Sequence, residues 1–312
     1  MISRTCSIAS PVSPWDVHEF WNTEACGAHY ISLEKGTAGF YEKYREFRYR
    51  TEWHIPLLVP FSETTGKRVL EIGCGNGADA VMFANYGAEY TGVDLTEAAV
   101  DAARRHFEVL NLRGAFQVEN AERLSFPEAS FDFVYSHGVL HHTPHPDVAF
   151  REVHRVLKPG GKAVLMLYHK HSLNYYLRIM GYMRARVLVH ILSRIGRFSR
   201  DSAGLGGGIV GVRGNVGSSV WELHYKNFLR FGWPYLRAQN FIHHATDGPE
   251  CPIAFVYTQR ALRRALAYFR SIETKIAHFP IRKTSLGWWI PLSIERQVAS
   301  CLGWYMFVYL TR

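Results

Sequence analysis

The sequence predicts an α/β protein with a mostly parallel sheet, helices on both faces of the sheet and an inserted helical cap. Between about residues 67 and 168, short apolar or β-branched runs alternate with helical patterns, which is typical of βαβ units. A glycine-rich turn directly follows the first of these runs. The alternation then stops, and an irregular segment rich in aromatic residues and arginine occupies about residues 171–257.

Two hydrophobic periodicities predict the elements of the core. Apolar, β-branched runs predict strands at residues 68–72, 89–93, 116–118, 131–135 and 163–168. Helical spacing of apolar residues predicts helices at residues 78–86, 97–110 and 148–157. Thr96 stands where it can cap the second helix, and the run Lys158-Pro159-Gly160-Gly161 ends the third.

Regular elements resume after the irregular segment. A helix capped by Thr258 and ending near residue 269, with strands near residues 271–279 and 304–311, would complete a seven-stranded sheet. We therefore divide the chain into an N-terminal helical cap segment (1–66), an α/β core (67–170), an inserted cap (171–257) and a C-terminal helix with strands that complete the sheet (258–312).

The composition is that of a chain that buries a core, with 47% hydrophobic and 20% charged residues. The net charge of +9 favours anionic partners such as nucleic acid, a membrane surface or an acidic substrate, although it also serves solubility. The N-terminus lacks the apolar stretch of a signal peptide, and Glu295, Arg296 and Gln297 interrupt the apolar residues 286–310. We expect a cytoplasmic protein.

The five cysteines, Cys6, Cys26, Cys74, Cys251 and Cys301, show no CxxC spacing. They suggest neither a disulfide framework nor a zinc knuckle.

The glycine-rich turn, Gly73-Cys74-Gly75-Asn76-Gly77, runs from a buried-type strand into a helix. Its glycines let the backbone approach a ligand closely, and the helix behind it presents unpaired N–H groups. Asp94 ends the second strand, 23 positions after Glu71, where its carboxylate can accept both hydroxyls of a ribose. The arrangement predicts a nucleoside-containing cofactor.

Two details point away from NAD: the third glycine comes one residue earlier than in G-x-G-x-x-G, and Glu71 precedes the turn.

The chain resembles class I S-adenosylmethionine methyltransferases, and among them the type 11 group with ubiquinone and menaquinone biosynthesis enzymes. Besides the turn, the resemblance rests on Val93-Asp94-Leu95, Asn120-Ala121-Glu122, Phe131-Asp132-Phe133-Val134-Tyr135-Ser136 and Arg155-Val156-Leu157-Lys158-Pro159-Gly160-Gly161.

The resemblance implies a Rossmann-like fold and S-adenosylmethionine as cofactor, with S-adenosylhomocysteine as its product. The turn would lie along the methionine part, Asp94 would bind the ribose hydroxyls, and Leu95 would pack on the adenine. Asn120 and Ala121 stand where the family usually has Asp-Ala at the adenine edge. The implied cofactor-binding residues are Glu71, Gly73, Cys74, Gly75, Gly77, Asp94, Leu95, Asn120, Ala121 and Ser136.

A helical pattern at residues 41–53 precedes the core. On it, Tyr44 and Arg48 are placed to close over the cofactor carboxylate. The alternative is a helix that packs on the sheet with a solvated basic side.

The loop after the fourth strand, Ser136 to Pro144, carries the candidate general base. We take His141 as the first choice and His142 as the second, because imidazole titrates near neutral pH and related small-molecule O-methyltransferases use histidines in this neighbourhood. Tyr168, at the end of the fifth strand, would face the same crevice. The alternative is that both histidines are satisfied by backbone or solvent at a helix start.

The same loop gives little support for a metal. His137 and His141 are four residues apart and His145 follows, but Gly138 and Pro144 oppose a regular helix and no H-E-x-x-H pattern is present. The pair His243-His244 is no stronger. We predict no metal site.

The sequence thus predicts in-line transfer of a methyl group to an O, N, C or S atom of a small, aromatic or lipophilic molecule. A nucleic-acid methyltransferase is an alternative suggested by the charge, but Ser136-His137-Gly138-Val139 stands where Asn/Asp-Pro-Pro-aromatic would be expected. A second alternative is a non-catalytic, membrane-peripheral cofactor-binding protein. Arginines at residues 180–197 would give the cap a basic helix for anionic lipid. The oligomeric state is left open.

Overall fold

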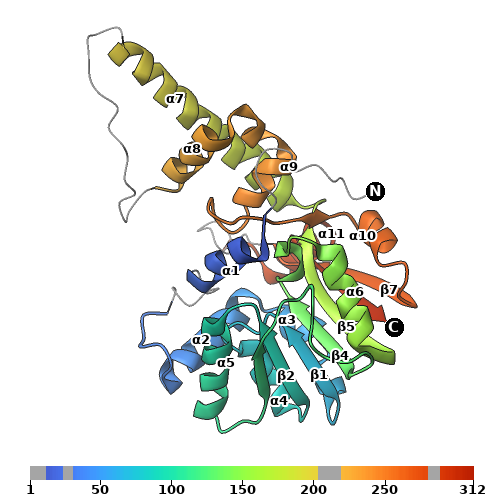
Figure 1. Cartoon of the computed structure of the whole chain (residues 1–312). Helices are drawn as coiled ribbons and strands as arrows, with labels where there is room; N and C mark the ends of the chain where they lie inside the picture. The colour runs from blue at the N-terminus through green and yellow to red at the C-terminus, as the bar shows by residue number, and fades with distance from the viewer. Residues whose placement is uncertain (1–11, 24–30, 203–218, 280–288) are drawn as a thin grey trace.

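The computed structural model describes residues 12–23, 31–202, 219–279 and 289–312 (Figure 1). Its strands are β1 (Arg68–Ile72), β2 (Glu89–Asp94), β3 (Ala115–Val118), β4 (Phe131–His137), β5 (Leu157–His169), β6 (Val256–Tyr257), β7 (Ser271–Ala277) and β8 (Tyr305–Thr311). Its α-helices are α1 (Pro14–Thr23), α2 (Ala38–Thr51), α3 (Ile55–Leu58), α4 (Ala78–Asn85), α5 (Glu97–Val109), α6 (Pro146–Val156), α7 (Arg184–Ser202), α8 (Val220–Phe231), α9 (Ala238–Phe241), α10 (Gln259–Ala265) and α11 (Leu292–Leu302). Cys6 and Cys26 lie outside the described residues.

The strands form one sheet in the order β3-β2-β1-β4-β5-β8-β7. The first five are parallel, and β8 runs antiparallel between β5 and β7. The short β6 pairs only with Tyr168 and His169 at the end of β5. The predicted class, a mostly parallel sheet with helices on both faces, is confirmed, with β6 as an eighth strand beyond the seven predicted.

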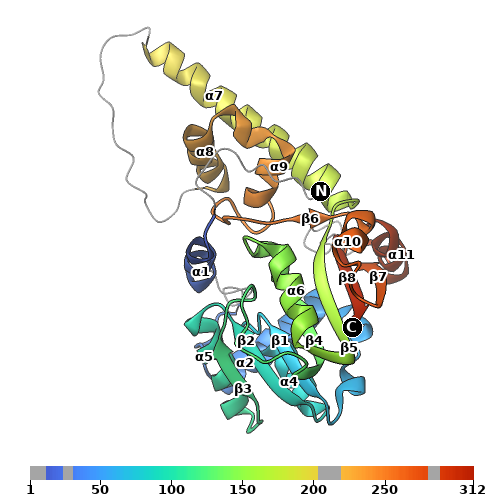
Figure 2. The same ribbon diagram turned by 45° about the vertical axis from the view of Figure 1, so that its right-hand side comes forward.

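Alternating residues of each strand enter two separate cores, because successive side chains of a strand point to opposite faces. In β5, Val164 and Met166 pack with Phe83 of α4 and Phe107 of α5. Their neighbours along β5, among them Leu165, pack on the other face against α6 and α10. Figures 1 and 2 show these helices on the two sides of the sheet.

The junction of α6 and β5 differs from the predicted turn. The run Lys158-Pro159-Gly160-Gly161 lies inside β5 as a bulge, because the pairing with β4 shifts between Phe131–Leu157 and Phe133–Lys162. Gly160 takes a φ of 76°, which favours glycine.

Thr96 and Thr258 cap α5 and α10 as predicted, accepting from Ala99 N at 3.3 Å and Ala261 N at 3.1 Å.

The inserted segment projects from the sheet as a helical arm (Figures 1 and 2). A π-helical stretch, Asn174–Met183, continues into α7, and α7 packs on α8. Ile179, Met183, Val187 and Ile191 recur every four residues and are buried in this contact. No helix among the described residues has the length and apolar character needed to cross a bilayer.

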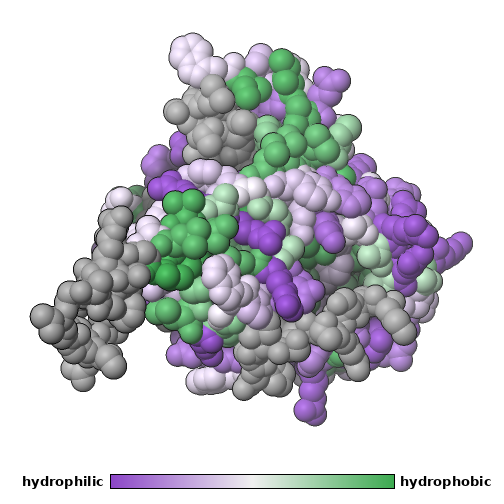
Figure 3. All heavy atoms as spheres, turned by 90° about the horizontal axis from the view of Figure 1, so that it is seen from above, coloured by the Kyte–Doolittle hydropathy of each residue, from purple (hydrophilic) through white to green (hydrophobic). Residues whose placement is uncertain are grey.

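The outer face of α7 is more apolar than a solvated helix usually is, since Val189 and Leu192 are exposed there. Seen from above, the face that carries the inserted helices shows apolar patches beside polar ones (Figure 3).

Gly303, between α11 and β8, provides a test of packing near the sheet. A Cβ at this position would lie 2.3 Å from the carbonyl oxygens of both Ala277 and Ala299. Both oxygens belong to the backbone, so no side-chain rotation can relieve the clash. We expect Gly303→Ala to lower the free energy of unfolding by about 1–3 kcal/mol, measured by urea denaturation.

Gly39→Ala in α2 is the matched control, because its new Cβ would meet only Leu33 Cδ1 at 3.7 Å. It should be neutral or stabilise the protein by about 0.5–1 kcal/mol, as expected of alanine in a helix. Equal stability of the two variants would contradict the packing argument.

Candidate active site

A cavity of about 1580 Å³ opens at the carboxyl ends of β1, β2, β4 and β5. Cavities for single ligands commonly measure about 300–1,000 Å³, so this one has room for two molecules. The predicted site residues that line it are Tyr44, Arg48, Glu71, Gly73, Cys74, Gly75, Asp94, Leu95, Asn120, Ala121, His142 and Tyr168. Gly77, Ser136 and His141 are not among the lining residues.

The glycine-rich turn is held against β2 by its backbone. Gly73 N and Cys74 N both donate to Val93 O, at 2.7 and 3.0 Å. Gly73 has a φ of 84°, and a Cβ there would lie 2.1 Å from Val139 Cγ2. Only glycine therefore fits this bend between β1 and the loop after β4.

Gly77 and Ser136 support the site from behind. Gly77, with a φ of 75°, begins α4 and lets it approach Ala103 of α5, where a Cβ would come within 3.3 Å. The Ser136 hydroxyl is buried and donates to Ile72 O at 2.9 Å, which ties β4 to β1. Both residues hold backbone that borders the cavity.

Asp94 connects the end of β2 to the turn. Its Oδ2 accepts from Gly75 N, and its Oδ1 accepts from the N–H and hydroxyl of Thr96, each at 3.1 Å. Burial raises the pKa of the Asp94 carboxyl, although the hydrogen bonds from Thr96 and Gly75 oppose that shift. The carboxylate is thus fixed in place where the glycine backbone meets the cavity.

Asn120 and Glu71 are also restrained. Asn120 Oδ1 accepts from Glu122 N at 2.9 Å, so its amide NH₂ is the group left to face a ligand. Glu71 accepts from the Tyr90 hydroxyl at 2.5 Å. Burial, reinforced by the nearby Asp79, raises the pKa of Glu71 well above its usual range, so that a protonated Glu71 is favoured.

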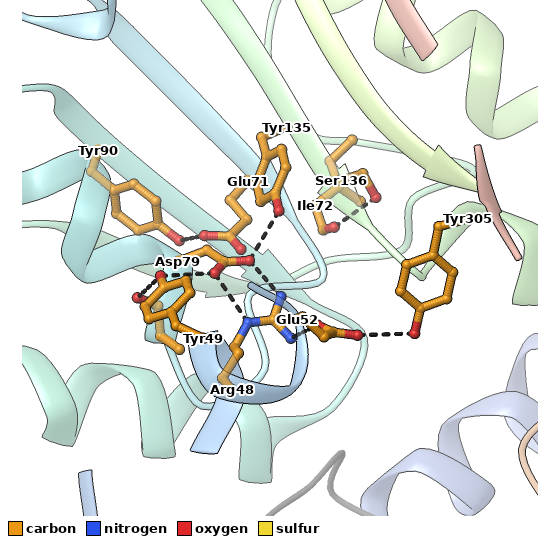
Figure 4. A network of polar contacts seen from close by, with 11 residues as sticks. Arg48, Tyr49, Glu52, Glu71, Ile72, Asp79, Tyr90, Tyr135, Ser136 and Tyr305 are labelled. Carbon is orange, nitrogen blue, oxygen red and sulfur yellow. Dashed lines mark hydrogen bonds and ion pairs between the residues drawn. The ribbon is translucent and has the colours of Figure 1, made fainter. Parts of the chain in front are cut away.

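Arg48 is the centre of a buried polar network (Figure 4). Its Nε and one terminal nitrogen bind the two oxygens of Asp79 at 3.0 and 2.5 Å, and its other terminal nitrogen binds Glu52 at 2.9 Å. The hydroxyls of Tyr49 and Tyr135 also donate to Asp79, at 3.0 and 2.9 Å. Three of the five guanidinium N–H groups are therefore used within the protein, which leaves two for a ligand.

The two predicted histidines have different positions. His141 is fully buried, with its ring 4.0 Å from Tyr168 and 4.4 Å from His142 between ring centroids. Burial lowers the pKa of His141 well below its usual value, and neither ring nitrogen has a hydrogen-bond partner among the described residues. His142 does reach the cavity, and its Nδ1 donates to Ile253 O at 2.7 Å.

The structure adds an acid that sequence reasoning missed. Asp247, in the inserted segment, lines the cavity and accepts from the Tyr168 hydroxyl at 3.0 Å to each carboxylate oxygen. Its Oδ2 lies 3.4 Å from His142 Nε2. No periodic signal marks Asp247, because it follows an irregular stretch 105 positions after His142.

A second missed group lies where α2 and β8 face the cavity. Tyr305 donates to Glu52 Oε1 at 2.9 Å and stacks on His278, with ring centroids 4.3 Å apart. His137, Glu52 and His278 line the same cavity. Burial raises the pKa of Glu52, but Arg48 and then the three histidines, His54 included, more than offset this and hold it well below its usual range.

One group of described residues could offer ligands to a metal. His142, Asp247 and Cys251 bring potential ligand atoms within 4.8 Å of one another. His142 Nδ1 and Cys251 Sγ both donate to Ile253 O, at 2.7 and 3.5 Å. These hydrogen bonds account for the arrangement, and we assign no metal to it.

Part of this chain is similar in sequence to known proteins. Residues 70–165 match the family model of a methyltransferase domain. The ubiquinone biosynthesis O-methyltransferase of Coxiella burnetii is 33% identical over 116 residues, which is 37% of this chain and 50% of the relative. That of Alkalilimnicola ehrlichii is also 33% identical, over 130 residues, which is 41% of this chain and 51% of the relative. The chain thus spans about half the length of the curated relatives it matches. These matches confirm the resemblance predicted from the motifs.

Two solved structures share the fold at 14% identity. One is magnesium protoporphyrin IX methyltransferase from Synechocystis PCC 6803 with bound SAH, with a TM-score of 0.51 over 96% of this chain and 100% of that one. The other is in the complex between the Haloferax volcanii Trm112 methyltransferase activator and a methyltransferase, with a TM-score of 0.52 over 95% and 96%. Both confirm the Rossmann-like methyltransferase fold across nearly the whole chain.

The Arg48 network predicts a pH-dependent loss of stability. Burial raises the pKa of Asp79, but the Arg48 charge and hydrogen bonds outweigh it and hold that pKa below its usual value. The carboxylate therefore stabilises the fold above its unfolded-state pKa and loses this effect as the pH falls through the lower, folded-state pKa. Asp79→Asn should cost about 3–5 kcal/mol at pH 7, because it leaves Arg48 short of a buried partner.

Urea denaturation at pH 7, 4 and 3 measures this effect. The difference between wild type and Asp79→Asn should shrink as the pH falls. Asp101→Asn is the control, since its exposed pair with Arg104 contributes about 0–1 kcal/mol. A difference that does not change with pH would contradict the argument.

Proposed function

We propose that this chain, which carries a class I S-adenosylmethionine-dependent methyltransferase domain of the group that includes the ubiquinone biosynthesis O-methyltransferases, transfers a methyl group to a small molecule. The observation that carries the proposal is the pinned Asp94 carboxylate beside the backbone of Gly73 and Gly75, at one end of a cavity with room for a second ligand.

The residues present fit the cofactor. The turn approaches the cavity without a Cβ at Gly73, where one would collide with Val139. Asp94 would hold the ribose hydroxyls, Leu95 and Ala121 would flank the adenine, and the Asn120 amide would meet its edge. When bound, S-adenosylmethionine supplies a methyl group already activated on a sulfonium. The two remaining N–H groups of Arg48, with Tyr44 beside them, would face its carboxylate.

The rest of the cavity would hold the acceptor. Aromatic side chains from the N-terminal helices and the C-terminal part line it, among them Trp21, Phe47, Trp53 and Phe279. Such a lining suits an aromatic or lipophilic molecule. The names of the curated relatives, which act in ubiquinone biosynthesis, agree with this class. The protein would orient the acceptor for in-line attack and exclude water.

We place the general base at His142 instead of His141. His142 faces the cavity, whereas His141 lies behind it and packs against Tyr168. Because Nδ1 of His142 donates to Ile253 O, its Nε2 carries the lone pair when the ring is neutral. Tyr168, which also lines the cavity, would orient the groups around it.

We also propose that the chain divides into the four segments given above, that the protein is cytoplasmic, and that the inserted cap contacts membranes. The exposed Val189 and Leu192 of α7, with Arg186 nearby, support the membrane contact. Turnover in the absence of any membrane would be compatible with the main proposal.

Calorimetry with S-adenosylhomocysteine tests the cofactor site. Asp94→Ala should weaken its affinity by about 100-fold or more, since hydrogen bonds to charged groups contribute about 1.5–3 kcal/mol each. Glu108→Ala, an exposed acid on α5, is the control and should bind as the wild type does. Tight binding of a nicotinamide or flavin nucleotide, with no affinity for S-adenosylhomocysteine, would refute the proposal.

Turnover distinguishes the two histidines. With a cell metabolite extract as the acceptor source, His142→Gln should lower formation of S-adenosylhomocysteine by about 10²-fold or more, with little change in its binding affinity. His141→Phe keeps a buried ring against Tyr168 and should retain most of the activity. If His141→Phe lowered turnover more than His142→Gln did, His141 would be the general base.

A further inference from the structure

We propose that His142, Asp247 and Tyr168 form a site that binds a hydroxyl group of the acceptor and removes its proton, so that the reaction is an O-methylation. The inference rests on the proposed function. It adds Asp247 as a positioning residue and names the chemical group that is methylated.

Asp247 is a carboxylate with unused acceptor capacity. Its side chain is 23% exposed, and the Tyr168 hydroxyl, shared between its two oxygens, is its one hydrogen-bond donor within the described part of the chain. A carboxylate has about four lone-pair sites, so acceptor sites remain open toward the cavity. Arg178, which lines the same cavity, attracts this carboxylate electrostatically. Asp247 therefore keeps acceptor sites that a hydrogen-bond donor of a ligand can fill.

His142 presents a second open acceptor to the same place. A carbonyl oxygen can only accept, so the 2.7 Å contact with Ile253 O fixes a proton on Nδ1. Nε2 is buried and has no hydrogen-bond partner in the part of the chain that the structure describes. It faces Asp247 Oδ2 at 3.4 Å. The ring itself is packed between His141 and Trp21, with centroids 4.4 and 5.2 Å away, so it has little freedom to turn.

Two acceptors that face each other at this distance repel unless a proton lies between them. Leaving a buried acceptor without a donor costs about 1–3 kcal/mol. A ligand hydroxyl beside the two groups has one proton to donate, which it can give to His142 Nε2 or share with Asp247 Oδ2. A carbon acceptor offers no such donor and a thiol only a weak one. A neutral amine can attack through its lone pair without first losing a proton, so a base in this position serves a hydroxyl-bearing molecule best.

The same arrangement completes the transfer. With S-adenosylmethionine bound, the hydroxyl oxygen would form a bond to its methyl carbon as the carbon–sulfur bond breaks, and the electron pair of that bond would leave with the sulfur. The hydroxyl proton passes to His142 Nε2. Asp247 stays ionised and stabilises the resulting imidazolium, which later returns the proton to water. The atoms and electrons of the transfer are thus all accounted for, and no further reactant is needed.

The experiment uses the full-length protein with ¹³C-methyl S-adenosylmethionine and a metabolite extract. Mass spectrometry finds the labelled compound, and the carbon and proton shifts of its new methyl group identify the atom that carries it. We expect a methyl ether. Asp247→Asn should lower the rate of labelling by about 10²-fold, within the range measured for positioned acid–base groups. Asp247→Glu, which keeps the charge, should recover part of that loss.

Two measurements separate this inference from loss of folding. The affinity for S-adenosylhomocysteine should stay within about twofold in Asp247→Asn, since Asp247 would not touch the cofactor. Asp147→Asn, an exposed acid on α6, is the matched control. If Asp247→Asn does not fold, Tyr168→Phe serves instead, because it removes the hydroxyl that holds Asp247, and should slow labelling by about 10-fold.

A labelled product methylated on carbon, sulfur or nitrogen would overturn the hydroxyl assignment while leaving the proposed function intact. So would an Asp247→Asn rate within threefold of the wild type. A wild type that neither binds S-adenosylhomocysteine nor labels any compound would overturn the proposed function, and this inference with it.

Discussion

The buried contact between Arg48 and Asp79 is the interaction on which the rest of the site depends. It joins α2, which comes before the sheet in sequence, to the first turn of α4, and Tyr135 brings β4 into the same contact. Glu52 and Tyr305 extend it to the last strand. A buried charge without its partner is costly, so these elements must form together. The floor of the cavity is rigid for this reason.

On that floor, each end of the cavity has its own chemistry. At one end, backbone N–H groups of the glycine turn and a fixed Asp94 offer polar groups suited to a nucleoside. At the other, His142 Nε2 has no hydrogen-bond partner among the described residues, and Asp247 accepts there from the Tyr168 hydroxyl alone, so both groups keep acceptor capacity. Two ligands with complementary needs can therefore occupy one cavity side by side, which is the condition for direct transfer of a group between them.

The inserted segment contributes more than a cover. Its helical arm is held by the recurring apolar contact between α7 and α8, and the chain after it returns to the cavity with Asp247 before pairing as β6 with the end of β5. Backbone from the same return, at Ile253, fixes the tautomer of His142. The proposed general base, His142 of the core, thus owes its orientation to backbone of the insertion.

The sequence by itself determined the sheet, its parallel strands and the meeting of the glycine turn with Asp94, because strand periodicity, the glycines at residues 73–77 and Asp94 are local features whose geometry follows from neighbours in the chain. It ranked His141 ahead of His142, whereas His142 is the one that lines the cavity, since both lie in a short helical turn whose rotation is set by contacts with distant residues. Asp247 and the Glu52–Tyr305 contact were decided only by the tertiary structure. Their partners are 79 to 253 positions apart, and no local pattern records which distant side chains a folded chain will bring within hydrogen-bonding distance.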